Sequence, residues 1–237
     1  MDTSQQNAAQ LSVIMPIYNE RCTLRAVVEA VLAQPCVKEL ICIDDCSNDG
    51  SRELLLALAE VNPKMIVLLH ERNKGKGASL RTGIRHASAN FTLFQDADLE
   101  YDPADYAALI APLRARTADA VYGSRFRRHA RYQGAYRAHR VINWLLTALS
   151  NRFTGLRLTD VETCYKVFRT DMLSGLPLRE DGFTIDPEIT AKLVRSRCRI
   201  HEVPISYRGR AFSEGKKITW MDGIKAVICI VRYGLWH

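Results

Sequence analysis

The amino-acid sequence predicts an α/β fold, in which a mostly parallel central sheet is flanked by helices. In the first hundred residues, apolar runs of about five residues alternate with segments whose apolar residues recur at helical spacing. Polar residues follow these runs, and the carboxyl ends of strands are where open sheets of this kind bind ligands. The composition, 47% hydrophobic and 25% charged among 237 residues, is that of a globular protein and excludes a disordered or collagen-like chain.

The first half of the chain supplies four predicted strands and three predicted helices. Residues 11–15 form an apolar run that we expect Pro16 to stop, and residues 21–33 carry leucine and valine at helical spacing. The segment 47–51, SNDGS, has the chemistry of a turn and a helix cap. The remaining predicted elements are strands over 39–43, 65–69 and 91–95 and helices over 52–60 and 78–87.

The second half is less regular. The predicted elements are strands over 118–122 and 200–207 and helices over 141–153, 186–196 and 221–233. The helix over 141–153 has a broad apolar face that includes Trp144, Leu145 and Leu149. No internal repeat is visible, and no uninterrupted apolar stretch approaches the ~18 residues that a membrane-spanning helix needs.

The net charge of +7 is unevenly distributed along the chain. Residues 1–124 carry 12 basic and 16 acidic side chains, whereas residues 125–237 carry 21 basic and 10 acidic ones. Six arginines and no acid lie between Arg125 and Arg140. Such a block is either a solvated face or a surface for nucleic acid, anionic lipid headgroups or a phosphorylated substrate, and charge alone does not choose among these.

The seven cysteines indicate a reducing compartment, because their number is odd and none lies in a CxxC pair. Cys42 and Cys46 flank two aspartates, but small buried thiols at a strand end explain them better than a metal site does. The N-terminus is polar and lacks the basic-then-apolar layout of a secretion signal. We therefore expect a cytoplasmic protein, or one that rests on the cytosolic face of a membrane.

Acidic residues lie at the predicted strand ends. Glu20 follows the first strand, Asp44 and Asp45 follow the second, and Asp96 and Asp98 follow the fourth, with Glu100 two residues further on. Alternate side chains of an extended segment point the same way, so Asp96 and Asp98 are expected to face one point beyond the sheet. Hard oxygen ligands in this arrangement suit Mg²⁺ or Mn²⁺. An acidic surface turn shows the same DxD pattern, but a position after an apolar strand favours a metal site.

A glycine-rich segment, NKGKGA at 73–78, precedes the predicted helix over 78–87. It matches neither the phosphate-loop pattern GxxxxGK[ST] nor the dinucleotide pattern GxGxxG, which breaks at Leu80. A plain loop that permits close packing is the favoured interpretation, although the N-terminus of the helix that follows can still favour an anion.

Seven motifs, in this order and spacing, carry a family resemblance. VIMPIYNE at 13–20, IDDCSNDG at 43–50 and QDADLE at 95–100 closely resemble the family-2 inverting glycosyltransferases, which have the nucleotide-sugar-binding GT-A fold. GSRF at 123–126, TDVETCYK at 159–166, EVPISY at 202–207 and RAFSEGK at 210–216 resemble the dolichyl- and polyprenyl-phosphate glycosyltransferases, of the dolichol-phosphate mannosyltransferase type. The resemblance runs from about residue 11 to beyond residue 217, nearly the whole chain.

The resemblance implies an organisation for the chain. A polar tail over 1–10 precedes a GT-A catalytic domain over 11–218, and a C-terminal helix over 219–237 follows it. Within the domain, 11–124 would bind the nucleotide sugar and 125–218 the acceptor, and the C-terminal part would form a basic arm that contains amphipathic helices.

The resemblance also implies roles for individual residues. The residues expected to hold the base and ribose of the donor are Pro16, Tyr18, Glu20, Ile43 and Asp45. Those expected to hold its diphosphate through a divalent metal are Asp96, Ala97 and Asp98, with Glu100 as a further metal ligand. Those expected to contact donor or acceptor phosphates are Arg125, Arg210 and Lys216. Thr163 and Cys164 stand where relatives have a small residue or glycine, which points to a different pocket there.

The expected reaction is transfer of a hexosyl group from a nucleotide sugar, of the GDP-mannose or UDP-glucose type, to a polyprenyl or dolichyl phosphate. A metal at Asp96 and Asp98 would neutralise the departing nucleoside diphosphate. A phosphate acceptor is largely ionised at neutral pH, so cations such as Arg125 matter more than a strong base. Asp160 is the candidate for orienting those cations or for serving as a base, and a loop acid that caps a turn is the plain alternative.

An apolar helix face beside an arginine block suits the surface of an anionic membrane, so we expect a peripheral membrane protein, with or without an anchoring partner protein. Packing of the helix over 141–153 against the core is the alternative.

A nucleic-acid-binding protein would not explain acids at three strand ends, so no nucleic-acid partner is expected. A sugar nucleotidyltransferase would need a glycine-rich basic loop after the first strand. A related glycosyltransferase with a soluble or cell-envelope saccharide acceptor would need a true general base.

Overall fold

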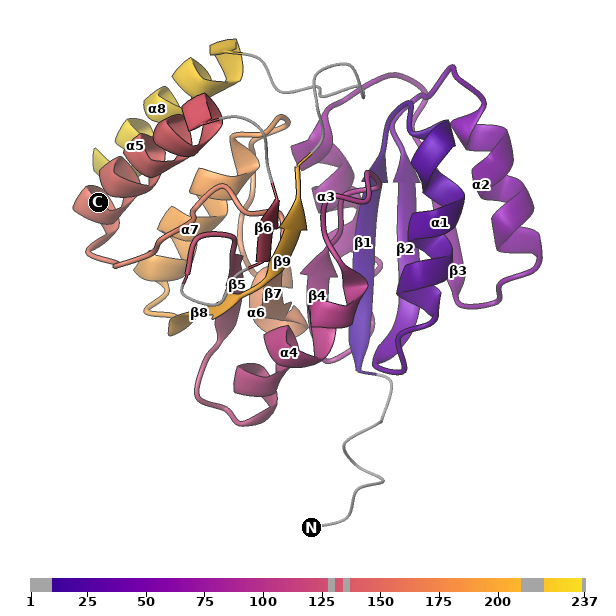
Figure 1. Ribbon diagram of the computed structural model, residues 1–237, viewed down its shortest axis with the longest axis horizontal. Coiled ribbons are helices and arrows are strands. Elements are labelled where there is room, and N and C mark those ends of the chain that lie inside the picture. The colour runs from indigo at the N-terminus through magenta and orange to yellow at the C-terminus, as the bar shows by residue number, and fades with distance from the viewer. Residues whose placement is uncertain (1–9, 128–130, 134–136, 210–219, 236–237) are drawn as a thin grey trace.

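The structure is a computed structural model that describes residues 10–127, 131–133, 137–209 and 220–235 (Figure 1). The segment 210–219, which contains the candidate phosphate contacts Arg210 and Lys216, lies outside the described residues, as do residues 128–130 and 134–136 of the arginine block.

A seven-stranded sheet forms the centre of the molecule, in the order β3-β2-β1-β4-β7-β5-β8. Its strands are β1 (Leu11–Ile17), β2 (Val37–Asp44), β3 (Met65–Leu69), β4 (Phe91–Phe94), β5 (Ala120–Ser124), β7 (Lys166–Arg169) and β8 (Ile200–Pro204). Strand β7 is antiparallel to both of its neighbours, and the other strands all run in one direction. The predicted mostly parallel sheet is confirmed. A second, two-stranded sheet pairs β6 (Arg131–Gln133) with β9 (Ser206–Arg208).

Helices cover the sheet. They are α1 (Arg21–Leu32), α2 (Ser51–Glu60), α3 (Lys76–Ile84), α4 (Tyr106–Arg114), α5 (Arg137–Thr154), α6 (Thr170–Ser174), α7 (Ile185–Arg195) and α8 (Trp220–Leu235), with a 3₁₀ turn, η2, at Pro103–Asp105. Helix α3 packs against β1 and β2, and α4 against β5 and β7. At one side of the molecule α5 and α8 lie side by side, with α7 next to α8 (Figure 1). No helix in the described part of the chain is long and apolar enough to cross a membrane.

The core is built on β1 and β2, whose side chains are buried on both faces of the sheet. Leu11, Val13, Ile14 and Met15 are all fully buried, as expected for a strand that helices cover on both sides. Such a strand shows a continuous apolar run in place of alternation, which is why its sequence predicts it well.

The prediction that Pro16 stops the first strand is wrong, because β1 continues to Ile17 and Pro16 stays in register with Ile43 of β2. The backbone of Ile14 faces β4, since its carbonyl accepts from the Gln95 amide, and Pro16 faces the same side two residues later. Pairing with β4 has ended by then. The missing N–H of proline therefore falls where no ladder partner requires it.

The predicted strand over 200–207 is two strands. Strand β8 ends at Pro204, and after Ile205 the chain leaves the large sheet to form β9 in the small one. The Ser206 amide donates to Asp105 Oδ2 over 2.7 Å, which fixes the chain where it changes sheets. Strand β7 and helix α4 were not predicted.

The topology brings the carboxyl ends of six parallel strands to one edge of the large sheet. The residues that follow β1, β2, β4 and β5 along the chain therefore emerge at a common edge. Strand β7 runs the opposite way, so the segment that leads into it, which contains Asp160, arrives at the same edge. Residues from distant motifs meet there.

Candidate active site

The loops after β1 and β2 hold each other in place. The Asn19 amide donates to Ser47 Oγ over 3.0 Å and the Glu20 amide to Ser51 Oγ over 2.9 Å, while the Asn48 amide donates to Asn19 Oδ1 over 2.9 Å. Asn19 has a φ of 51°, a left-handed conformation that asparagine tolerates. The cross-links fix the backbone around Tyr18 and Glu20, the two predicted donor-binding residues of this loop.

Two other predicted donor-binding residues lie deeper. Ile43 is fully buried in the core, against α3 at Gly83, and Pro16 is half-buried beside it in the sheet. Neither side chain belongs to the loops beyond the strand ends. Ala97 is also buried, and its carbonyl accepts a hydrogen bond of 2.7 Å from Thr23 Oγ1, which ties the segment after β4 to α1.

Asp45 organises the glycine-rich loop. Its carboxylate is buried and accepts hydrogen bonds from the amides of Lys74 and Gly75, over 2.9 and 2.7 Å, and contacts His70 Nδ1 at 2.7 Å. Both oxygens therefore bind groups of the protein. The segment that the sequence indicated as a plain loop is held against the end of β2 by this carboxylate.

Lys76, the first residue of α3, is the site residue that sequence reasoning missed. Its Nζ lies 2.7 Å from Asp96 Oδ1 and 5.8 Å from the centre of the Phe183 ring. Burial lowers the pKa of the Lys76 ammonium, but the Asp96 carboxylate outweighs it and holds that pKa well above its ordinary value. Burial likewise raises the pKa of Asp96, and the charge and hydrogen bond of Lys76 bring it below its ordinary value. The pair is charged at neutral pH.

Close backbone packing places Lys76. A Cβ on Gly75 would lie 2.5 Å from the Asp181 carbonyl oxygen, and one on Gly77 would lie 2.3 Å from that of Glu180. Gly75 also has a φ of 91° and a ψ of 164°, a conformation that is essentially restricted to glycine. The two glycines on either side of a lysine were the signal in the sequence that could have identified this cation.

Asp98 and Glu100 lie on a turn beyond β4. The Glu100 amide donates to Asp98 Oδ1 over 3.1 Å, and Leu99 between them has a φ of 61°. Tyr207 of β9 donates its hydroxyl to Glu100 Oε2 over 2.7 Å. Burial first, and then the charge of Glu100, raises the pKa of Tyr207, so this phenol stays protonated.

The residues at this turn fit a divalent metal that is shared with a substrate. Among the described residues, no three acidic, histidine or cysteine side chains lie close enough together to hold a metal ion by themselves. Mg²⁺ is usually bound by one or two carboxylates together with substrate phosphates and water, not by an all-protein cage. Asp96 and Asp98 offer two hard oxygen ligands of this kind.

Arg125, directly after β5, is held by Asp160. Its Nε and Nη2 donate to the two carboxylate oxygens over 2.7 and 2.8 Å, and its amide donates to Oδ2 over 3.1 Å. Asp160 is fully buried, and the Arg125 guanidinium lies 5.0 Å from the centre of the Tyr207 ring. Burial lowers the pKa of Arg125, but Asp160 outweighs it and holds that pKa well above its ordinary value. Tyr207 thus links the arginine to Glu100.

Glu162 is a second carboxylate in the segment before β7. Its Oε1, like Thr163 Oγ1 and Asn143 Nδ2, is buried without a hydrogen-bond partner in the described part of the structure. Burial first, and then the charge of Asp186, raises the pKa of Glu162 to about 7. The nearby Lys166 ammonium, which is paired with Asp186, lowers the pKa of Glu162 but does not outweigh these two causes.

Comparison with known proteins identifies the family. The model of the family "Glycosyl transferase family 2" matches residues 12–176, which include all of β1 but its first residue, the DxD turn, Arg125 and Asp160. The chain belongs to glycosyl transferase family 2.

The names of several family-2 relatives of this chain describe enzymes that act on prenyl phosphates. An undecaprenyl-phosphate mannosyltransferase from Micrococcus luteus is 27% identical, over 94% of this chain and 93% of its own length. A dodecaprenyl-phosphate galacturonate synthase from Rhizobium johnstonii is 27% identical over 87% of this chain. An undecaprenyl-phosphate 4-deoxy-4-formamido-L-arabinose transferase from Salmonella enteritidis is 28% identical, also over 87%. The matches span 61% and 62% of the last two proteins.

Solved structures share the family-2 fold of this chain. Glucosyl-3-phosphoglycerate synthase from Mycobacterium tuberculosis, in complex with phosphoglyceric acid, has a TM-score of 0.73 at 20% identity, over 98% of this chain and 84% of that one. Its complex with Mn²⁺, uridine diphosphate and phosphoglyceric acid has a TM-score of 0.71, over 99% and 83%. These likenesses confirm the GT-A-type architecture that the sequence resemblance implied. The basic C-terminal arm stays a prediction.

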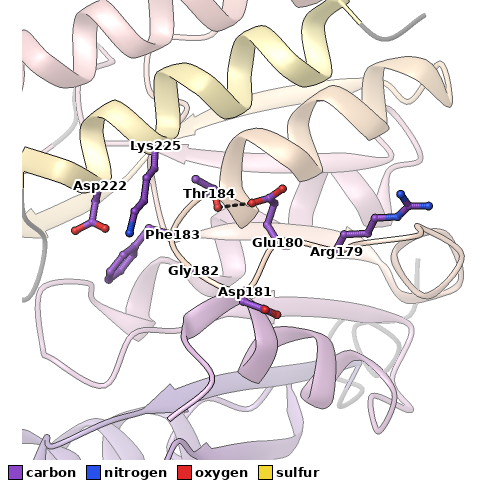
Figure 2. A pocket seen from close by; sticks show the side chains of 8 residues that line it. All are labelled: Arg179, Glu180, Asp181, Gly182, Phe183, Thr184, Asp222 and Lys225. Carbon is purple, nitrogen blue, oxygen red and sulfur yellow. Dashed lines mark hydrogen bonds between the residues drawn. The ribbon is translucent and has the colours of Figure 1, made fainter.

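Figure 2 shows a cavity of this family-2 chain, of about 300 Å³, whose wall includes Phe183, the ring over which the Lys76 ammonium lies. Its lining comes from the loop before α7 and from the first turns of α8. The residues are Arg179, Glu180, Asp181, Gly182, Phe183, Thr184, Asp222 and Lys225. No sequence motif indicated it, because the two segments are about 40 residues apart and carry no pattern of their own.

Proposed function

We propose that this chain is an inverting glycosyltransferase that moves a hexosyl group from a nucleotide sugar, of the GDP-mannose or UDP-glucose type, to a polyprenyl phosphate. One observation carries the proposal. The Asp96–Asp98 turn lies at the same edge of the sheet as Arg125, whose guanidinium is held by the buried Asp160. Carboxylates that can share a metal with a diphosphate suit the donor, and a fixed cation suits a phosphate acceptor. The names of the family-2 relatives support the same acceptor class.

On the donor side, the loop that carries Tyr18 and Glu20 would hold the nucleoside, with Asp45 shaping the adjoining wall. Asp96 and Asp98, with Glu100 behind them, would ligate Mg²⁺ or Mn²⁺ together with the donor diphosphate. When bound, the metal neutralises charge on the departing diphosphate as a Lewis acid. Lys76, paired with Asp96, adds a cation at the same place and orients that carboxylate.

On the acceptor side, Arg125 would hold the phosphate that attacks the sugar. Such a phosphate is largely ionised at neutral pH, so it needs positioning more than deprotonation. Both oxygens of Asp160 bind Arg125, which favours orientation over the base role that the sequence left open. Arg210 and Lys216 are proposed as further phosphate contacts.

A soluble or cell-envelope saccharide acceptor is the second candidate, and one observation favours it. A hydroxyl acceptor needs a general base, whose pKa is best placed near the working pH. Glu162 has an unpartnered buried oxygen, and its pKa is raised to about 7. The two candidates therefore differ in which carboxylate matters, Asp160 for a phosphate acceptor and Glu162 for a hydroxyl.

We also propose that the protein rests on a membrane surface through α5 and α8. Outward-facing residues of α5 are apolar, with Val141 56%, Trp144 65% and Leu145 54% exposed, whereas its buried residues include Asn143 and Thr147. Helix α8 adds a neighbouring set of exposed apolar side chains, Met221, Ile224, Val227, Ile228 and Leu235. Apolar faces of this kind on surface helices suit the headgroup region of a bilayer. A cytosolic-face location and an anchoring partner protein remain part of the proposal.

A donor screen tests the proposed function. The full chain is incubated with Mg²⁺ or Mn²⁺, a short polyprenyl phosphate and one labelled donor at a time, namely GDP-mannose, UDP-glucose or UDP-N-acetylglucosamine. We expect metal-dependent transfer of label to the organic phase from one of these donors. Binding of a donor with labelling of a soluble saccharide, and none of the lipid, would support the second candidate and contradict the first.

A further inference from the structure

The cavity is connected to the proposed diphosphate site through Phe183 and Lys76. Phe183, which forms part of its wall, is the ring over which the Lys76 ammonium lies, and the same ammonium pairs with Asp96. The loop that carries Phe183 also packs against the backbone of Gly75 and Gly77. The side chains of Phe183 and Lys76 therefore link the cavity to Asp96, the first carboxylate of the DxD turn.

The lining of the cavity favours an uncharged, polyhydroxylated ligand. Three carboxylates and two cations line it, and Arg81 and Arg232 pair with two of the carboxylates, so the charges nearly balance and favour an uncharged ligand over a phosphate. Carboxylates accept hydrogen bonds from hydroxyls, cations donate to them, and an aromatic ring can cover the apolar face of a sugar. Phe183 is the ring that lines this cavity.

The polar groups of the cavity differ in whether they have hydrogen-bond or ion-pair partners within the protein. Glu180 accepts hydrogen bonds of 2.8 Å from Thr184 Oγ1 and 3.0 Å from the Tyr233 hydroxyl, and Asp181 pairs with Arg81. Lys225, in contrast, has no hydrogen-bond or ion-pair partner in the described part of the chain. Figure 2 shows its side chain reaching from α8 toward Phe183.

We infer that this cavity receives the sugar that is transferred, and that Phe183 and Lys225 determine which sugar is accepted. The inference rests on the proposed function. In a nucleotide sugar the hexose is bonded to the distal phosphate, so it must lie next to the diphosphate site at Asp96 and Asp98. Lys225 donates hydrogen bonds to the hydroxyls of the sugar, and the Phe183 ring packs against its apolar face.

Calorimetric titration of the full chain, with Mg²⁺ present, tests the inference by comparing each nucleoside diphosphate with its sugar derivative. The ligands are GDP, GDP-mannose, UDP and UDP-glucose, and the variants are Lys225→Met and Phe183→Leu. We expect each variant to bind the preferred nucleotide sugar about tenfold more weakly, and the nucleoside diphosphate as tightly as the unchanged chain does. Lys225→Arg, which keeps the charge, should restore part of the loss.

Lys38→Met is the matched control, because Lys38 is an exposed lysine on β2 that bonds only to Ser88 in the described structure. It should change neither affinity, and circular dichroism checks that every variant is folded. An equal loss for nucleoside diphosphate and nucleotide sugar, or no loss for either, would overturn the inference alone. So would a rise confined to the KM of the polyprenyl phosphate, since the cavity would then serve the acceptor. No nucleotide binding by the unchanged chain would instead remove the proposed function, and the inference with it.

Discussion

Asp160 and Arg125 form a buried ion pair, and we propose that it fixes one cation at the sheet edge. Both carboxylate oxygens of Asp160 accept hydrogen bonds from the Arg125 guanidinium, and Oδ2 also accepts one from the Arg125 amide. Breaking such a pair leaves an uncompensated buried charge, which costs more than the pair itself contributes to stability.

We therefore expect Asp160→Asn to lower the free energy of unfolding by about 3 kcal/mol and to raise the KM for the acceptor phosphate about tenfold. The affinity for the nucleoside diphosphate should stay the same, because the hydrogen bonds that the Asp160 carboxylate accepts in the described structure all come from Arg125. Urea unfolding and steady-state kinetics measure the two effects. A loss confined to kcat, together with loss of the acidic limb of the pH profile, would show that Asp160 is a base.

Asp98 lies on a turn beyond β4, not in the core, so its carboxylate can be removed without loss of the fold. Asp98→Ala should lower kcat/KM by roughly a hundredfold or more, because a metal shared with the diphosphate would lose a ligand. Glu53→Ala, on an exposed position of α2, is the control and should be fully active. Substantial activity of Asp98→Ala at any concentration of Mg²⁺ would contradict the metal site.

Glu162 makes stability depend on pH. Its pKa is about 7 in the folded protein and 4.5 ordinarily, so between these values the folded state binds more protons than the unfolded state. The free energy of unfolding then falls as the pH rises through this window.

Glu162→Gln removes this titration. Relative to the unchanged chain, the variant should gain roughly 2 kcal/mol of stability between pH 5 and pH 8. Thermal melts at the two pH values measure the gain, with Glu53→Gln as the control. A difference between variant and unchanged chain that does not vary with pH would show that Glu162 is ionised throughout.

At the scale of single elements, the start of α3 depends on Gly75. Gly75→Ala should destabilise the protein by about 2 kcal/mol, because the backbone conformation there is strained for other residues and the new Cβ would meet the Asp181 carbonyl oxygen. Nucleoside diphosphate affinity should fall as well, since Lys76 follows directly.

Gly175→Ala is the matched control for this change. A Cβ on Gly175 would find its nearest neighbour at 3.5 Å, an ordinary contact. That variant should melt within a few degrees of the unchanged chain. Equal melting temperatures for the Gly75 and Gly175 variants would mean that the loop at 73–78 can shift without cost.

The outward faces of α5 and α8 give a prediction about binding to vesicles. Replacing Trp144 and Ile228 together by glutamine removes two of their most exposed apolar side chains. Co-sedimentation with anionic liposomes at low salt should then fall about tenfold or more. Val61→Gln, an exposed apolar residue after α2, should leave it unchanged. No sedimentation of the unchanged chain would contradict the membrane proposal.

For the molecule as a whole, the sequence predicted the sheet and the positions of the acids well, because both follow from local patterns. Buried parallel strands are continuous apolar runs, and a DxD after such a run must emerge at the carboxyl edge. Lys76 and the cavity at Phe183 could not be predicted from local patterns, since Lys76 meets Phe183 about 100 residues later and the cavity joins segments about 40 residues apart, contacts that form only in the fold. The four residues of β7 were too short to stand out from the surrounding motif.

Strand β7 also determines the order in which the sheet can be completed. It lies between β4 and β5, yet it follows both of them in the chain. During synthesis β1 to β4 can pair as they emerge, whereas β5 has no neighbour in the large sheet until residues 166–169 have been made. Until that moment β4 presents an open edge of unpaired backbone groups, the kind of edge on which chains associate wrongly. A fragment that ends before Lys166 should therefore aggregate, although it contains the whole DxD turn.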